Sequence, residues 1–148
     1  MPAARSRSGS RRRSNARELL ALVTRASFDL RSDGLAARTV TVKLRDMDFK
    51  TRSARRTLPE PVVSDRVVMG VAKELLAKLR ATRRVPARLI GVALSSLAED
   101  PKADQLTLFE RDDPLAETDR DRAIARTVDR VREKFGARGI VPAALVDE

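Results

Sequence analysis

Lysine, arginine, threonine and serine side chains are concentrated between residues 38 and 57, where their spacing suits phosphate binding. In the first half of this stretch, Val40, Val42 and Leu44 alternate with Thr, Lys and Arg residues. Because strand side chains point alternately to opposite faces, this pattern predicts a strand with one buried and one basic, hydroxyl-rich face. Cations neutralise phosphates and hydroxyls bond to phosphate oxygens without reading bases. The candidate contacts are Arg38, Thr39, Thr41, Lys43, Arg45, Lys50, Thr51, Arg52, Ser53, Arg55 and Arg56.

A charge-rich strand is often only a solvated surface, and that alternative applies to either strand taken alone. Two adjacent strands with seven basic residues favour a nucleic-acid partner. Arg38 has the parity of the apolar residues, which predicts a position at the edge, and the facing of Arg88 is ambiguous. Phe49 is expected in the core, so the pattern gives no support to base stacking on single strands.

The charge of the whole chain supports the same class of partner. Its net charge is +10 over 148 residues. Residues 1–56 hold 15 Lys/Arg against 5 Asp/Glu, a balance of +10, whereas residues 57–148 hold 16 of each. The chain has no Cys and no His, which excludes disulfides, thiolate zinc sites and histidine catalysis. No apolar run approaches the roughly 20 residues of a membrane span, and a cytoplasmic, nucleoid-associated location is expected.

Helical spacing of apolar residues predicts the elements that support the basic strands. Asn15 is the expected N-cap of a helix that runs to about Arg31, and Gly34 ends it in the left-handed conformation. Ser64 is expected to cap a second helix from Asp65 to about Thr82. The residues expected to face the core are Leu19, Leu20, Val23, Ala26 and Leu30 of the first helix, and Val67, Val68, Val71, Ala72, Leu75, Leu76 and Leu79 of the second.

Turn and strand signals complete the predicted order of helix, strand, strand, helix, strand. Residues 46–48 form a turn, a second strand begins at Phe49, and residues 58–61 form a rigid connector with two prolines. Residues 85–94 are nearly all apolar, which predicts a central strand. Asp46 and Asp48 lie two apart in the turn, so a turn-forming role is expected rather than metal binding.

The ends of the chain differ in composition from the middle. Residues 1–14 are predicted to be a disordered basic arm, which is either a solvated tail or a further phosphate contact. Residues 98–121 are a polar linker that contains an isolated apolar cluster, residues 105–109. Residues 122–148 form a last helix and tail, with Ile124, Val128, Val131 and Phe135 on one helix face.

Several stretches together resemble the C-terminal "little finger" of Y-family translesion DNA polymerases of the DNA polymerase IV type. They are residues 34–45, 48–51, 88–92, 105–109 and 129–136, in that order. The resemblance implies a small α+β domain whose sheet lies along the DNA major groove beside a separate catalytic core. It assigns residues 15–97 to a βαββαβ sheet that lacks its first strand, with helices on one face, followed by a linear motif and a helix.

The resemblance also implies a second partner. The Gln-Leu-Thr-Leu-Phe segment is similar to the peptide by which these polymerases bind the sliding clamp. Leu108 and Phe109 would fill an apolar cleft and Gln105 would orient the peptide, with Leu106 between them. The alternative is a short strand or a satellite contact on the domain. The acidic flanks of the segment favour the linear motif.

The catalytic palm, fingers and thumb of the resembled family have no counterpart in these residues. We therefore expect no catalytic residues and no cofactor, because magnesium would belong to that core. The expected partners are primer–template DNA, the sliding clamp and a separate polymerase chain, with no membrane. Two alternatives stay open, a general basic RNA- or ribosome-binding protein and a non-functional remnant of a truncated polymerase gene.

Overall fold

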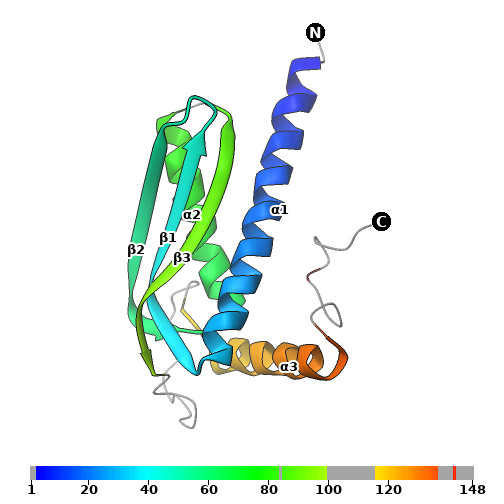
Figure 1. The fold of residues 1–148 in the computed structure, drawn as a ribbon, viewed down its shortest axis with the longest axis vertical. Coiled ribbons are helices and arrows are strands. Elements are labelled where there is room, and N and C mark those ends of the chain that lie inside the picture. Colours follow the sequence, from blue (N-terminus) through cyan, green and yellow to red (C-terminus); the bar gives the residue numbers. More distant parts are fainter. Residues whose placement is uncertain (1–2, 84, 100–115, 137–141, 143–148) are drawn as a thin grey trace.

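Among the described residues, the fold consists of three helices and one antiparallel sheet (Figure 1). The computed structural model describes residues 3–83, 85–99, 116–136 and 142, with only the backbone for residues 3–14. The elements follow as α1 (Ala3–Ser32), β1 (Leu35–Asp46), β2 (Thr51–Val62), α2 (Asp65–Thr82), β3 (Ala87–Glu99) and α3 (Asp119–Phe135). The α+β prediction, with helices on one face of the sheet, is confirmed.

β1 is the centre of the sheet, which has the strand order β2-β1-β3. Both neighbours pair with β1 in antiparallel orientation. The predicted order lacks the first strand of a βαββαβ sheet. Within the described residues β1 nevertheless has partners along both edges, β2 on one and β3 on the other.

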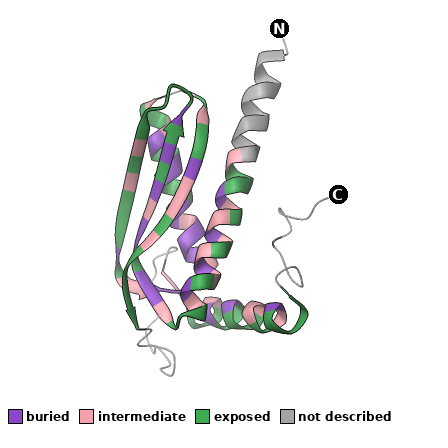
Figure 2. Cartoon of the chain, viewed as in Figure 1, coloured by how far each residue is buried: buried purple, intermediate pink, exposed green. Residues whose placement is uncertain are grey.

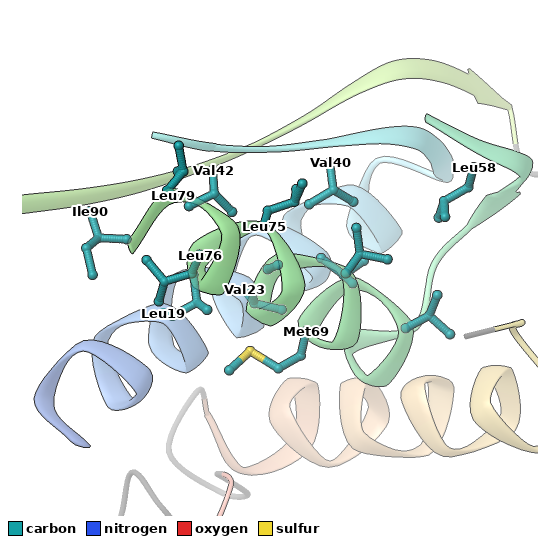
Figure 3. Packing of buried hydrophobic residues seen from close by; sticks show 14 of the residues in the cluster. Leu19, Val23, Val40, Val42, Leu58, Met69, Leu75, Leu76, Leu79 and Ile90 are labelled. Atoms are coloured by element: carbon teal, nitrogen blue, oxygen red, sulfur yellow. The ribbon is translucent and has the colours of Figure 1, made fainter. Parts of the chain in front are cut away.

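The core lies between the sheet and the two helices α1 and α2, as Figure 3 shows. Val40, Val42 and Leu44 of β1 are fully buried against the apolar face of α2. Leu19 and Val23 of α1 complete the same cluster. All seven predicted apolar positions of α2 are buried, and its predicted Ser64 cap accepts a hydrogen bond from the Arg66 amide at 3.2 Å. Gly34 has the predicted left-handed φ of 69°.

The N-terminal arm was predicted wrongly. Helix α1 begins at Ala3, so Asn15 is not its cap and the backbone before it is helical. Ala and Arg have high helix propensity, and a helix that is already nucleated extends at little cost. The lack of apolar residues to bury in this segment therefore does not prevent a helix.

Two strand predictions also need correction. The rigid connector of residues 58–61 belongs to β2, which continues to Val62 across an irregularity in register. β3 is an edge strand of the described sheet and runs to Glu99, with most of its residues exposed. Its apolar composition suggested a central place, but the strand order leaves one of its edges unpaired within the described residues.

Helix α3 lies beside the C-terminal end of α1 (Figure 2). Hydrogen bonds from Arg31 to Asp129 and from Arg66 to Asp121 join α3 to α1 and α2. Its buried residues are Arg122, Ala125 and Arg132, whereas Ile124 and Phe135 of the predicted apolar face are 52% and 67% exposed. Glu117, just before α3, accepts hydrogen bonds from the amides of Val63 and Ser64.

Charge pairs support this attachment of α3. Burial raises the pKa of Glu117. The Arg66 guanidinium lowers the pKa of Asp121 to about 2, and Asp121 also closes a capping box with Thr118. Arg31 of α1 bonds to Asp129 of α3 at 2.7 and 2.8 Å. None of the described helices has the length and apolar composition to cross a membrane.

Candidate nucleic-acid interface

The face of the sheet opposite the helices carries part of the predicted basic surface. Directly paired residues share a face, and the register pairs Thr41 with Arg55, Lys43 with Ser53, and Arg45 with Thr51. Residues two apart along a strand stand about 7 Å apart on the same face. We call this surface the outer face: Thr39, Thr41, Lys43 and Arg45 of β1, Thr51, Ser53, Arg55 and Thr57 of β2, and Leu89, Gly91, Ala93 and Ser95 of β3.

Three cations of the outer face are available to a ligand. Lys43, Arg45 and Arg55 are exposed, and within the described part of the chain no acidic side chain pairs with them. β3 contributes Gly91, which has no side chain, and the short side chains of Ala93 and Ser95 beside them. Short side chains let a ligand backbone approach a sheet closely. The outer face therefore combines unpaired positive charge with a shallow, uncharged strip.

At one end of the outer face, the Thr39 hydroxyl bonds to two others, that of Thr57 on the same face and that of Ser96, which follows Ser95 in β3. The Thr39 hydroxyl lies 3.0 Å from that of Thr57 and 3.0 Å from that of Ser96, and Thr39 is only 6% exposed. Arg38 is exposed and donates through Nε to the Leu58 carbonyl at 3.2 Å. Thr51, Ser53 and Lys50 are exposed, whereas Thr41 is half-buried.

Arg52 and Arg56 lie on the other face of β2, toward helix α2. They pair in register with Leu44 and Val40, whose side chains are in the core. Arg52 Nη1 donates to the Leu79 carbonyl and to the Thr82 hydroxyl at the C-terminal end of α2. Arg56 Nη1 donates to Glu74 at 2.8 Å. The structure thus does not bring these two arginines together with Lys43, Arg45 and Arg55.

A buried carboxylate holds the turn between β1 and β2. Asp46 is fully buried, and its two oxygens accept from Arg52 at 3.1 Å and from Arg83 at 2.9 Å. Arg83 also bonds to Asp48, and this hydrogen bond lowers the pKa of the Asp48 carboxyl. The predicted turn-forming role thus extends, for Asp46, to a link between the hairpin and the end of α2.

Phe49 was wrongly expected in the core. It is 59% exposed and has a left-handed φ of 68°. The guanidinium of Arg88 lies 4.5 Å from its ring centroid and that of Arg45 lies 5.9 Å from it. Arg88, whose facing the sequence left ambiguous, thus lies near the outer face. The reason is that β3 carries one extra residue opposite Arg45 and Asp46. The available signal was an aromatic residue directly after a polar turn.

Two predictions lie outside what the structure can test. Gln105, Leu106, Leu108 and Phe109 fall outside the described residues. Among the described residues, no three Asp or Glu side chains gather as they would around a metal ion. The expectation that the chain holds no cofactor stays a prediction.

Comparisons with known proteins cover most of the chain. Residues 7–108 match the impB/mucB/samB family C-terminal domain. The chain is 36% identical to DNA polymerase IV 1 of Mesorhizobium japonicum over 124 residues, which are 82% of this chain and 26% of that protein. It is 36% identical to DNA polymerase IV of Caulobacter vibrioides over 126 residues, 84% of this chain and 29% of that protein. A mouse relative, DNA polymerase kappa, is 31% identical over 88 residues, 57% of this chain and 10% of that protein.

The matches agree with the resemblance found in the sequence. The chain spans about a quarter of the length of the bacterial relatives named above. More than half of the chain lies within the family match, and the α+β sheet with helices on one face is the fold expected for it. The chain belongs to the impB/mucB/samB family C-terminal domain, the little-finger domain of Y-family DNA polymerases of the DNA polymerase IV type.

Proposed function

We propose that the chain binds duplex DNA through the outer face of its sheet, as the little-finger part of a translesion DNA polymerase. The observation that carries this proposal is the exposure of Lys43, Arg45 and Arg55 on one face, without acidic partners among the described residues. Cations and short side chains on an open sheet can follow a sugar–phosphate backbone without reading bases. Such recognition suits a protein that must accept damaged templates.

The relatives support the proposal through their names. The bacterial ones are DNA polymerases IV, and this chain matches about a quarter of each. Polymerisation would need carboxylates that hold catalytic metal ions, which we assign to a separate catalytic core. The chain would then bind primer–template DNA, at a cytoplasmic, nucleoid-associated location.

Salt dependence provides the test of the outer face. Changing Lys43, Arg45 and Arg55 together to Ala is expected to make the negative slope of log affinity against log salt shallower by about 2 to 3, because each phosphate contact contributes about −0.9 to that slope. Fluorescence anisotropy with a labelled blunt duplex measures the slope. RNA duplex of the same sequence serves as competitor, and equal RNA affinity would favour the general RNA-binding alternative.

A control triple variant separates local contacts from net charge. Arg25, Lys73 and Lys78 are exposed on helices α1 and α2, and changing them to Ala removes the same charge from the helical side. The control is expected to change the slope much less. An equal effect of both triple variants would show that the outer face is not the DNA surface.

We also propose that residues 105–109 bind the sliding clamp. The support is the similarity of Gln105, Leu106, Leu108 and Phe109 to clamp-binding peptides, together with their acidic flanks. Changing Leu108 and Phe109 to Ala is expected to abolish capture by an immobilised clamp, since two buried side chains each contribute about 1.5–3 kcal/mol. Duplex DNA affinity should stay the same. Capture that survives both changes would remove this assignment.

A further inference from the structure

An exposed aromatic side chain lies at the end of the outer face, beside the β1–β2 turn. Phe49 is 59% exposed; Met47, two residues before it, and Leu89, which pairs with Arg45 in register, are 54% and 58% exposed. The guanidinium groups of Arg45 and Arg88 lie 5.9 and 4.5 Å from the ring centroid. More than half of the phenylalanine surface therefore stays open although cations flank its ring.

The backbone of Phe49 indicates that the exposure is built into the turn. Its φ of 68° lies in the left-handed region, which favours Gly and Asn and is costly for an aromatic residue. Strained residues of this kind cluster at binding sites, where the surrounding structure holds them. A hairpin turn with no further role would be more stable with Asn or Gly at this position.

The surroundings hold Phe49 firmly. Its amide donates to the Asp46 carbonyl at 2.9 Å, and the Asp46 amide donates to the Lys50 carbonyl at 2.9 Å. The Met47 amide donates to the Pro86 carbonyl at 3.0 Å, which ties the turn to the start of β3. The buried Asp46 carboxylate fixes the same turn through Arg52 and Arg83. The ring is thus presented on a rigid support.

We propose that Phe49, flanked by Arg45 and Arg88, is a stacking site for an unpaired nucleobase of single-stranded DNA that continues from the bound duplex. The proposal rests on the proposed DNA-binding outer face, because Lys43, Arg45 and Arg55 would deliver the strand to the ring. Proteins that bind single strands combine cations that follow the backbone with an aromatic ring on which a base stacks. Arg88 can add a cation–π contact or hold the adjacent phosphate.

Fluorescence anisotropy measures the affinity for three DNA ligands that share the same duplex sequence. They are a blunt duplex, the duplex with a single-stranded thymine extension, and the duplex with an abasic extension of equal length. The two extensions carry the same phosphates and differ only in bases. The wild-type protein is expected to bind the thymine extension about 5- to 150-fold more tightly than the abasic one, the range for one stacked base. Phe49→Asn is expected to abolish this difference and leave blunt-duplex affinity unchanged.

Two further variants make the result specific. Phe49→Asn should unfold at the same or a higher temperature, because Asn accepts a left-handed φ more readily than Phe. Phe135→Asn is the matched control, since Phe135 is 67% exposed on α3 with Lys134 Nζ 5.5 Å from its ring centroid. This control should keep the preference for the thymine extension.

A fluorescent reporter completes the test. The chain has no tryptophan, so Phe49→Trp introduces a single one. Its emission is expected to be quenched by the thymine extension and not by the abasic one.

Equal affinity of the wild-type protein for both extensions, or a preference that survives in Phe49→Asn, would overturn the stacking site while blunt-duplex binding still supported the outer face. If the wild-type protein did not bind the blunt duplex, that result would instead count against the proposed function.

Discussion

Asp46→Ala is expected to lower the free energy of unfolding by about 3 kcal/mol, because it leaves guanidinium groups without their buried counter-charge. The Asp46 side chain is 0% exposed and pairs with Arg52 and Arg83, whose side chains are 19% and 30% exposed. Its loss removes the link between the β1–β2 turn and the end of α2. Urea denaturation followed by circular dichroism measures the change.

The neighbouring carboxylate provides the control for Asp46. Asp48 also pairs with Arg83, but its side chain is 39% exposed, and solvent screens such a pair. Asp48→Ala is expected to leave the denaturation midpoint almost unchanged. Equal midpoints for the two variants would contradict a special role of the buried carboxylate.

Arg31→Ala is expected to destabilise the domain by about 3 kcal/mol and to loosen helix α3. The Arg31 side chain is 7% exposed and pairs with Asp65 of α2 and Asp129 of α3. It also donates to the Val63 carbonyl at 2.7 Å. Its removal leaves two carboxylates and one carbonyl without this guanidinium partner. The loss is costly because partly buried charges need a partner. Hydrogen exchange should show lost protection in residues 119–135.

Two comparisons isolate the geometry at Arg31. Arg31→Lys keeps the charge but lacks the planar fork that holds Asp129 through two hydrogen bonds, so only partial rescue is expected. Arg66→Ala breaks the pair with Asp121 at a position 50% exposed, and should cost less than about 1 kcal/mol. If Arg31→Ala left the protection of α3 unchanged, α3 would not depend on this pair.

The sequence predicted well where polarity and periodicity agree. In β1 the apolar and polar residues alternate without exception from Thr39 to Arg45, so the buried face could be assigned directly. In α2 a wide apolar stripe follows a serine cap and two prolines, and its bounds were predicted correctly. The family resemblance rested on ordered motifs, one of which includes most of β1, and the family match confirmed it.

The sequence-based prediction of side-chain facing failed where basic residues occupy both odd and even positions of a strand. In β2, Arg52 and Arg56 share one parity and Arg55 has the other, with no large apolar residue before Leu58 to mark the buried face. Register therefore decides the facing, and the pairing of Leu44 with Arg52 turns that arginine toward α2. The basic surface of the outer face is smaller than predicted for this reason.

The sequence by itself determined the helix-backed α+β domain, the family and the concentration of positive charge in the first 56 residues. Local periodicity and charge depend only on neighbouring residues, so they can be read along the chain. Only the tertiary structure decided which cations share a face, that β3 is an edge strand in the described sheet, and that Phe49 is exposed between Arg45 and Arg88. These features depend on strand register and on one left-handed backbone angle, which distant contacts fix.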